Sequence, residues 1–568
     1  MAPNKKWWTN SVGYVIYPAS FQDSNGDGVG DLPGIVSRLD YLKELGVSIL
    51  WIGPIFDSPM DDGGYDVRDY RKINPLFGSM EDLERLLKEA HERGLKVLLD
   101  VPLNHTSDEH EWFKKALKDP NAPERDFYFF RKSRIIDGQK KAPNNWKSFF
   151  DESAWSEVPG EDSQYLHLFS KRMPDLNWAN PAVQEAFCSL FRFYLDKGVD
   201  GFRLDASAHL AKEPSLSDSA LPPDEDGLVL DTSKFSNRPE LFQYLRMLKD
   251  KVFSQYDCLI IGEVGGGISP EDSLKLSGPE GGLDMVLNFD TVWNNGAWES
   301  IDKKDEEIKT DVISLKRNFM HWYNACHEQA HLPLYWCNHD HPRVVSQYGD
   351  VNFRDQSAKM LFLTALFLYG TYFIYFGEEI GMSNVQYDSL EAFYPDVSSK
   401  NEILALKKRG YADEQILHYM NRISRVNART PMQWTGGKQA GFTTGKPAFP
   451  VNENYKQGIN VEAQSPDIYS TLAYYRFAIG LRKQIDIAEA ISNGSLDIID
   501  WNHPDVFSYV REWNGRKFMV ISNFRPYTVY FSFWFGLVNI LLHNYGDAKL
   551  NDHVFELRPY EAFLLEVR

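Results

Sequence analysis

The stretch Gly201-Phe202-Arg203-Leu204-Asp205-Ala206-Ser207-Ala208-His209 has an apolar start and a charged end. Read as a strand, it places Arg203 and Asp205 on one face, because side chains alternate with a period of two. A neighbouring arginine keeps an aspartate ionised near neutral pH, and an ionised, oriented carboxylate is a usable nucleophile. An isolated Arg-x-Asp is more often a structural ion pair. The functional interpretation therefore depends on what the other strand ends carry.

The segments on either side of this stretch alternate between apolar strands and amphipathic helices, among them a helix over residues 181–197. Repeated strand–helix units predict a parallel sheet with right-handed crossovers. Eight such units favour closure into a (β/α)8 barrel over a doubly wound sheet. The eight predicted strands are residues 13–21, 48–56, 96–103, 200–206, 258–263, 285–289, 333–340 and 371–379.

Two parts of the chain depart from this alternation. Residues 106–173 have weak periodicity and many aromatic residues, which predicts a small domain inserted after the third strand. Near the C-terminus, Asn514-Gly515 is a strong hairpin signal between two alternating segments, so residues 489–568 are predicted to form an all-β sandwich. The catalytic barrel would then comprise residues 1–105 and 174–488.

The composition excludes several classes of protein. The 568 residues carry a formal net charge of -19, which argues against a nucleic-acid or anionic-membrane partner. The 4 cysteines are scattered, so neither a zinc ribbon nor a disulfide framework is indicated. No apolar run is long enough to span a bilayer, and the polar start over residues 1–8 does not resemble a signal peptide. We expect a cytoplasmic protein with a small-molecule substrate and no organic cofactor, either a monomer or a dimer.

The predicted strands end in polar residues that are suited to catalysis. In a barrel of this kind the C-terminal strand ends meet at one face. Crowded carboxylates split their pKa values, so that one is protonated while another is ionised, which is the division that a glycosidase needs. The residues at these ends are Asp100, His105, Arg203, Asp205, Glu263, His339 and Asp340.

These strand ends resemble, in order, the sequence signatures of glycoside hydrolase family 13, the α-amylase family. The likeness covers nearly the whole chain, and its five ordered motifs are residues 100–105, 173–177, 201–205, 262–264 and 338–340. Three further stretches resemble the α-glucosidase and oligo-1,6-glucosidase branch of that family: residues 61–66, 340–343 and 424–434.

The resemblance implies a role for each matching residue. Asp205 would be the nucleophile, Glu263 the general acid/base, and Asp340 the residue that holds sugar hydroxyls and stabilises the transition state. Two departures concern the outer wall of the pocket: Val426 replaces the usual acidic residue, and His341 replaces the commoner glutamine. The implied substrate-binding residues are Asp62, Tyr65, His105, Phe169, Arg203, Ala206, His339 and Arg425.

The loop over residues 23–31 has oxygen donors at alternate positions, as calcium loops do. It is not an EF-hand, because its twelfth position is Gly34. A plain Asx turn explains such a run equally well. The resemblance implies a structural Ca²⁺ (or Mg²⁺), because related glucosidases bind such an ion with this loop. The ligands would be Asp23, Asn25, Asp27, Val29 and Asp31.

A second metal motif, H-E-x-x-H, occurs at residues 327–331. In zinc proteases it lies on a helix and is completed by a further ligand. Here Pro333 follows at once, and no glutamate occurs between Glu328 and Glu378. We therefore interpret the motif as a helix end at the surface.

The expected function is that of a retaining, exo-acting α-glucosidase on short oligosaccharides or disaccharides, with α-1,4 bonds favoured because Ala206 is small. Three alternatives remain at this point. The first is an oligo-1,6-glucosidase, and the second is a glucosyl-transferring or isomerising relative. The third is a non-catalytic transporter-subunit homologue, which the intact motifs and the absence of a membrane segment argue against.

Overall fold

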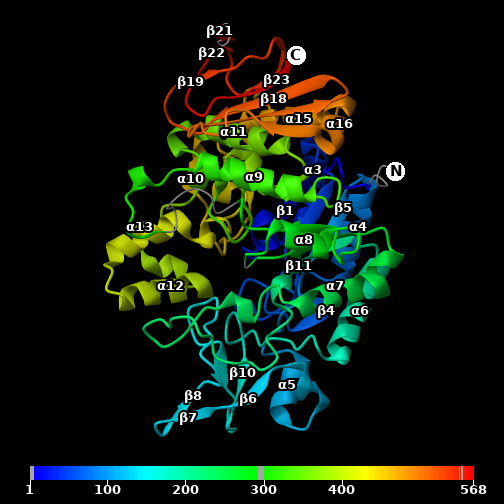
Figure 1. The fold of residues 1–568 in the computed structure, drawn as a ribbon, viewed down its shortest axis with the longest axis vertical. Helices are drawn as coiled ribbons and strands as arrows, with labels where there is room; N and C mark the ends of the chain where they lie inside the picture. The colour runs from blue at the N-terminus through cyan, green and yellow to red at the C-terminus, as the bar shows by residue number, and fades with distance from the viewer. Residues whose placement is uncertain (1–5, 266, 292–299, 549, 552–553) are drawn as a thin grey trace.

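A computed structural model describes residues 6–265, 267–291, 300–548, 550–551 and 554–568 (Figure 1), so part of the predicted polar start, residues 1–5, lies outside it. Eight strands form one parallel sheet in the order β13-β12-β11-β5-β2-β1-β15-β14. The end strands β13 and β14 lie against each other and nearly close the barrel, so the predicted (β/α)8 fold is confirmed. The strands are β1 (Val12–Ile16), β2 (Ile49–Ile52), β5 (Lys96–Pro102), β11 (Gly201–Asp205), β12 (Leu259–Glu263), β13 (Met285–Leu287), β14 (Pro333–Leu334) and β15 (Thr371–Tyr375).

Several predicted strands are too long, the first and the seventh most of all. The first ends at Ile16, because Pro18 has no N–H for the ladder and instead begins the short helix α1 (Pro18–Phe21). The strand predicted over residues 333–340 is a ladder only at Pro333–Leu334. The chain after it turns, and the side chain of Asn338 accepts a hydrogen bond from the N–H of Asp340.

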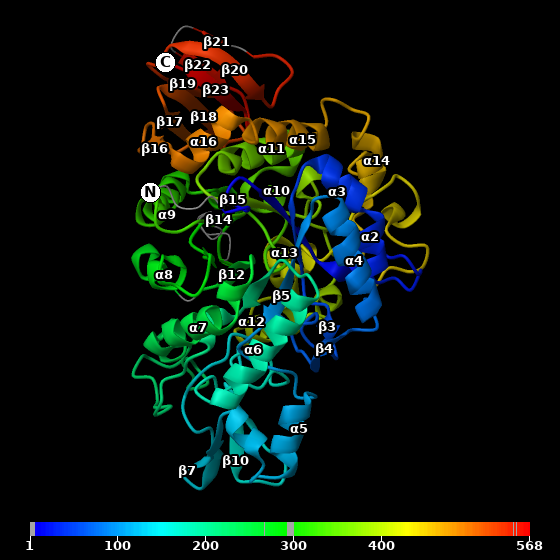
Figure 2. The same ribbon diagram turned by 90° about the vertical axis from the view of Figure 1, so that its right-hand side faces the viewer.

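Helices surround the barrel (Figures 1 and 2), and several begin at side-chain caps. Ser79 and Asp82 form a capping box at the start of α4, and Asn180 caps α6 ahead of Pro181. The barrel helices are α2 (Leu32–Ser37), α3 (Leu39–Leu45), α4 (Met80–Glu92), α6 (Pro181–Asp196), α7 (Pro239–Lys251), α8 (Pro270–Ser277), α9 (Val312–Cys326), α10 (Val344–Tyr348) and α11 (Arg354–Leu366).

The inserted segment forms a separate lobe at one end of the molecule (Figure 1). It contains a three-stranded antiparallel sheet, β6-β10-β9, and a hairpin of β7 and β8. Trp146, Trp155 and Leu166 form a small core beneath it. Its elements are α5 (Glu111–Lys118), β6 (Phe130–Lys132), β7 (Arg134–Ile136), β8 (Gln139–Lys141), β9 (Trp155–Glu157) and β10 (Ser163–Leu166).

The C-terminal part is an antiparallel β domain with two sheets, β16-β17-β18-β23-β20 and β19-β22-β21. The predicted hairpin is present: Asn514 and Gly515 both have positive φ, as a two-residue turn between β17 and β18 requires. The strands are β16 (Ser495–Ile498), β17 (Val506–Trp513), β18 (Arg516–Asn523), β19 (Val529–Ser532), β20 (Leu537–His543), β21 (Leu550–Asn551), β22 (Val554–Leu557) and β23 (Ala562–Val567).

Two helices connect the barrel to this domain. They are α15 (Thr471–Arg482) and α16 (Ile485–Asn493), and α16 spans the boundary predicted between residues 488 and 489. Helix α11 lies between the barrel and the β domain, and every residue from Ser357 to Leu366 is buried. Between the barrel and α15 come α12 (Val397–Lys408), α13 (Asp413–Ile423) and α14 (Val461–Gln464).

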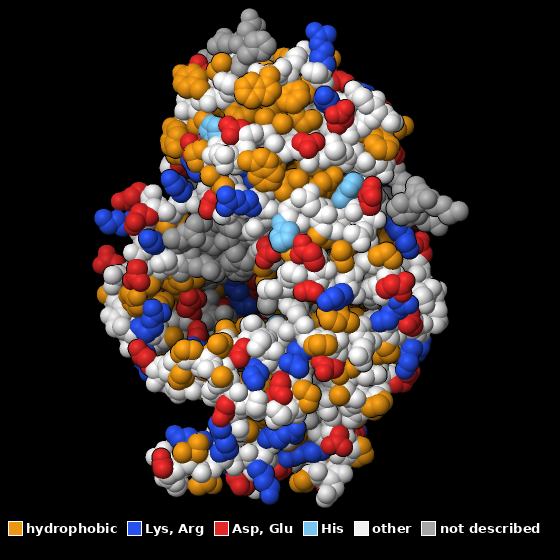
Figure 3. Space-filling view, viewed as in Figure 1, with side chains coloured by type: hydrophobic (Ala, Val, Ile, Leu, Met, Phe, Trp, Pro, Cys, Tyr) orange, Lys and Arg blue, Asp and Glu red, His pale blue; other side chains and the backbone are white. Residues whose placement is uncertain are grey.

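The visible surface mixes charged and apolar side chains (Figure 3). On the face seen in Figure 3, acidic and basic side chains are interspersed, and apolar side chains gather over the C-terminal domain. In the described part of the chain, no helix is long and apolar enough to cross a bilayer.

The H-E-x-x-H stretch begins where α9 has already ended, at Cys326. Glu328 has a positive φ of 67°, so the two histidines do not share a helical face. A ring nitrogen of His331 is hydrogen-bonded to the hydroxyl of Thr371 at 2.9 Å. Among the described residues, no three His, Cys, Asp or Glu side chains are grouped as metal ligands.

A buried ion pair joins the insert to the barrel. His105 and Asp175, at the two ends of the insert, form a β-bridge, and Lys212 places its ammonium 2.8 Å from Oδ2 of Asp175. The same ammonium donates to Oδ1 of Asn104 and to the carbonyl oxygen of His209, both at 2.6 Å. The ends of the insert are therefore fixed beside the strand ends that carry the predicted catalytic residues.

We predict that Lys212→Met lowers the free energy of unfolding by about 3–5 kcal/mol, because it leaves the buried Asp175 carboxylate without its partner. The measurement is the urea midpoint followed by circular dichroism. Lys408→Met is the matched control, since Lys408 pairs with Asp226 on the surface, where an ion pair contributes about 1 kcal/mol or less. Equal midpoints for the two variants would show that the buried pair does not stabilise the joint.

Candidate active site

The centre of the site is the fully buried guanidinium of Arg203 on β11. The parallel register places Arg203 beside Asp100 of β5, and the two side chains pair at 2.7 Å. Arg203 Nη1 also donates to Oδ1 of Asp205 at 2.6 Å, and Nη2 lies 2.8 Å from Oε2 of Glu263 on β12. One cation thus holds three carboxylates from three neighbouring strands.

Asp205 and Glu263 are each anchored through one oxygen. Ala206, which follows Asp205, has a left-handed backbone (φ 49°), and its N–H donates to Oε2 of Glu263 at 2.9 Å. Burial raises the pKa of Asp205; the Arg203 guanidinium opposes this rise, and the Glu263 carboxylate adds to it.

Asp340 lies in a more cationic environment. His339 Nε2 is 3.0 Å from its Oδ2, and Arg425 and Arg429 donate to its Oδ1 at 3.0 and 3.2 Å. Burial opposes ionisation of Asp340, but these three neighbours outweigh it and hold its pKa well below the usual range. Asp340 is therefore a carboxylate at neutral pH.

A second arginine, Arg425, closes one end of the site. Arg425 donates to Asp62 at 2.5 Å and to Oδ2 of Asp396 at 2.9 Å through Nε. Asp396 also pairs with Arg429 at 3.4 Å and caps α12 by accepting from the N–H of Ser399. This network ties the loop near residue 62 to the segment 396–429, which is more than 300 residues further along the chain.

Tyr65 and two histidines, His105 and His339, lie in the wall of the site. The Tyr65 hydroxyl donates to Asp100 at 3.0 Å and lies 2.7 Å from His339 Nε2, and the two rings stack at 5.1 Å. His105 is buried, which lowers its pKa to about 4, and its Nε2 has no hydrogen-bond partner among the described residues. A neutral ring with a free nitrogen is suited to a hydroxyl ligand.

These residues surround a pocket of about 360 Å³. Nine of the eleven predicted catalytic and substrate-binding residues line it, and Arg203 and His339 lie behind its wall. The predicted residues in the lining are Asp62, Tyr65, His105, Phe169, Asp205, Ala206, Glu263, Asp340 and Arg425. His341, singled out in the sequence as unusual, also lines this pocket.

Several residues were not predicted. Phe149 and Phe150, from the insert, line the pocket, and Asp396 and Arg429 hold its charged wall. The adjacent phenylalanines of the aromatic-rich insert, and the place of Arg429 within residues 424–434, were usable signals. No local pattern marks Asp396, since its partners are distant in sequence.

The predicted metal loop is ordered by its own backbone. Asp23 accepts from the N–H groups of Asn25, Gly26 and Gly28, and Asp27 accepts from that of Val29. Asp31 caps α2 through Oδ1 and accepts from Ser24 through Oδ2. The hard oxygen donors of Asp23, Asn25, Asp27 and Asp31 and the Val29 carbonyl match the chemistry of Ca²⁺ or Mg²⁺. Several of these oxygens already accept N–H groups, so the fit is partial, and the ion itself remains a prediction.

Comparisons with known proteins agree with this geometry. The model of the alpha amylase catalytic domain matches residues 15–491. An oligo-1,6-glucosidase of Bacillus cereus is 41% identical over 99% of this chain and 100% of its own, and a trehalose-6-phosphate hydrolase of Bacillus subtilis is 39% identical over 98% of each. The isomaltulose synthase of Protaminobacter rubrum superposes with a TM-score of 0.92 at 34% identity, over 100% of both chains.

We predict that Asp396→Asn lowers kcat/KM by about tenfold, because it weakens a charge-assisted contact that holds Arg425 against Asp62 and Asp340. Asparagine keeps the helix cap, so the fold should be retained. The initial rate of glycoside hydrolysis provides the measurement, with the exposed Asp388→Asn as control. Equal kcat/KM for both variants would show that Asp396 does not position Arg425.

Proposed function

This chain belongs to the α-amylase family of glycoside hydrolases, and we propose that it is a retaining, exo-acting α-glucosidase that removes terminal α-linked glucose from short oligosaccharides or disaccharides. The observation that carries the proposal is the anchoring of Asp205 and Glu263 on one buried guanidinium. Two carboxylates held this close suit a double displacement, for which the spacing is about 5 Å, and not the wider spacing of inverting enzymes.

In the proposed mechanism, Asp205 and Glu263 each react through the carboxyl oxygen that Arg203 does not contact. Glu263 gives its proton to the glycosidic oxygen as the C–O bond breaks, and Asp205 attacks the anomeric carbon to form a covalent glucosyl ester. The leaving sugar departs as an alcohol. Glu263, now a carboxylate, takes a proton from water, which attacks the same carbon and releases Asp205. Two inversions return the α anomer.

The charges around Asp340 support its role in the transition state. Because its pKa is held low, Asp340 is an anion beside the carbon that becomes positively charged. The free Nε2 of His105 is available to a sugar hydroxyl. The Asp62–Arg425 contact closes one end of the pocket and favours a terminal glucose over an internal unit of a chain.

The linkage is proposed from the wall of the leaving-group site. Ala206 lies in the pocket, and its single methyl group leaves space next to the leaving sugar. In the enzymes that this chain resembles, valine at this position goes with α-1,6 cleavage and a smaller residue goes with α-1,4 cleavage. We therefore propose that α-1,4 bonds are favoured. The 41% identity with an oligo-1,6-glucosidase favours the α-1,6 alternative, and the isomaltulose synthase likeness favours glucosyl transfer.

Two properties outside the pocket complete the proposal. We propose that Asp23, Asn25, Asp27, Asp31 and the Val29 carbonyl hold a structural Ca²⁺ or Mg²⁺, which would stabilise the loop and take no part in catalysis. We also propose a reducing, cytoplasmic environment, supported by four buried cysteines that form no disulfide in the structure.

We predict that Asp205→Asn lowers kcat by about 10³-fold or more, because it removes the nucleophile. Hydrolysis of maltose is followed by glucose release. Asp290→Asn, outside the pocket lining, is the control. Activity of the Asp205→Asn enzyme within tenfold of the parent would contradict the assignment. NMR of the earliest product should show α-glucose, and β-glucose appearing first would rule out retention.

For linkage, we expect the parent to have a higher kcat/KM on maltose than on isomaltose, and Ala206→Val to shift the ratio toward isomaltose. Two added methyl groups in a binding site change discrimination by about 1–3 kcal/mol. Because valine at a left-handed position also costs about 1 kcal/mol or more of stability, the midpoint of unfolding is measured alongside the kinetics. A parent that prefers isomaltose tenfold would refute the inference from Ala206.

Chelation should lower the Tm and leave the initial rate unchanged, because an ion that binds only the folded state stabilises it by mass action. The Tm is measured with and without EDTA, and then after Ca²⁺ or Mg²⁺ is restored. Asp27→Asn should reduce the response to EDTA. An unchanged Tm, with no metal found by elemental analysis, would remove the structural ion from the proposal.

A further inference from the structure

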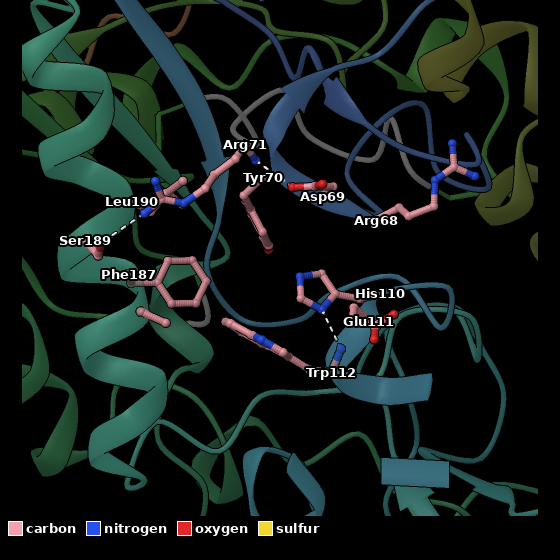
Figure 4. A pocket seen from close by; sticks show the side chains of 11 residues that line it. Arg68, Asp69, Tyr70, Arg71, His110, Glu111, Trp112, Phe187, Ser189 and Leu190 are labelled. Carbon is pink, nitrogen blue, oxygen red and sulfur yellow. Dashed lines mark hydrogen bonds between the residues drawn. The ribbon is translucent and has the colours of Figure 1, made fainter. Parts of the chain in front are cut away.

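A second pocket, of about 340 Å³, lies outside the catalytic one. It is formed between β4 (Asp69–Ile73), the start of α5 and the middle of α6 (Figure 4). Its floor and walls are aromatic, and its rim is charged and polar. The aromatic residues are Tyr70, His110, Trp112 and Phe187; the rim residues are Arg68, Asp69, Arg71, Glu111 and Ser189.

The aromatic rings leave an open slot between them. Tyr70 and Phe187 are buried and meet edge to face at 5.4 Å, while the half-buried Trp112 packs 4.5 Å from His110. Figure 4 shows the four rings around one central space. Aromatic ring faces of this kind pack well against the C–H surfaces of a pyranose.

His110 directs a hydrogen-bond donor into this space. Its Nδ1 accepts from the N–H of Trp112 at 3.1 Å, which places the hydrogen of the neutral ring on Nε2. The ring is neutral near pH 7, since burial lowers its pKa to about 4. The residue is only 7% exposed, and its bond to Trp112 uses Nδ1, not Nε2. Figure 4 shows this nitrogen facing the space beside Tyr70.

The rim offers both an acceptor and donors. The Asp69 carboxylate accepts from the N–H of Arg71 and pairs with Lys72 at 3.0 Å, and the Arg71 guanidinium donates to the Ser189 hydroxyl at 2.8 Å. Both signs of charge therefore lie on one rim. This balance disfavours a simple anion or cation and suits adjacent hydroxyl groups of a neutral ligand.

We propose that this pocket binds one pyranose unit of a neutral sugar at a site separate from the catalytic pocket. The site is connected to the catalytic one through Tyr70, whose hydroxyl lies 2.9 Å from the carbonyl oxygens of both Pro102 and His105. The segment that carries His105 is therefore shared: one side faces the catalytic pocket and the other is bonded to the wall of the second pocket.

The test is fluorine NMR of the full chain labelled with fluorotryptophan, titrated with D-glucose. Trp112→Phe identifies the Trp112 resonance, and the highly exposed Trp534 on the C-terminal domain serves as the internal reference. We expect a saturable shift of the Trp112 resonance below about 100 mM glucose, the range of weak single-sugar sites. Arg71→Ala should raise the glucose concentration at the midpoint by about three- to tenfold, the loss of affinity expected for one hydrogen bond.

The Asp62→Ala variant distinguishes binding in the two pockets, because it alters the catalytic pocket and leaves the second one intact. A Trp112 midpoint unchanged by Asp62→Ala supports the second site. A Trp112 shift that disappears in this variant, or that keeps its midpoint in Arg71→Ala, would assign the effect to the catalytic pocket and overturn the proposal. No shift up to about 100 mM glucose would also overturn it. The experiment follows the Trp112 resonance and does not measure turnover. Its outcome therefore does not depend on the proposed α-glucosidase activity.

Discussion

The buried guanidinium of Arg203 is the constraint on which the rest of the site depends. A cation removed from water is costly unless it is paired, and Arg203 is paired with Asp100, Asp205 and Glu263. The same contacts bring the carboxylates of three strands together, where they would otherwise repel one another. Stability and chemistry are thus linked, because the contacts that neutralise the arginine also orient the two groups proposed to break the glycosidic bond.

The end of the pocket that Arg425 closes depends on a different kind of contact. Asp62, Asp340 and Asp396 come from three distant segments and converge on Arg425, with Arg429 beside them. The barrel strands do not carry these arginines. They lie on a segment whose position is set by packing of α12 and α13 over the strand ends. The depth of the pocket, and with it the preference for a terminal sugar, therefore depends on the loops that the barrel supports.

The inserted segment contributes residues to both pockets. Its ends are held by the β-bridge of His105 to Asp175 and by Lys212, and its phenylalanines line the catalytic pocket. Its first helix, α5, also forms one side of the second pocket. Both pockets thus adjoin the segment between Pro102 and His105, whose carbonyl oxygens lie next to the Tyr70 hydroxyl.

Much of this architecture could be predicted from sequence. Buried parallel strands read as short apolar runs, and a barrel collects their C-terminal ends at one face; Asp100, Asp205 and Glu263 were therefore expected to meet. The strand ends at Ile16 and Leu334 were missed, because Pro18 and the turn at Asn338 act through local hydrogen bonding that periodicity does not report. Asp396 and the second pocket were decided only by the tertiary structure. Their partners are far away in the chain, so no spacing in the sequence records a contact that arises only when separate elements pack together.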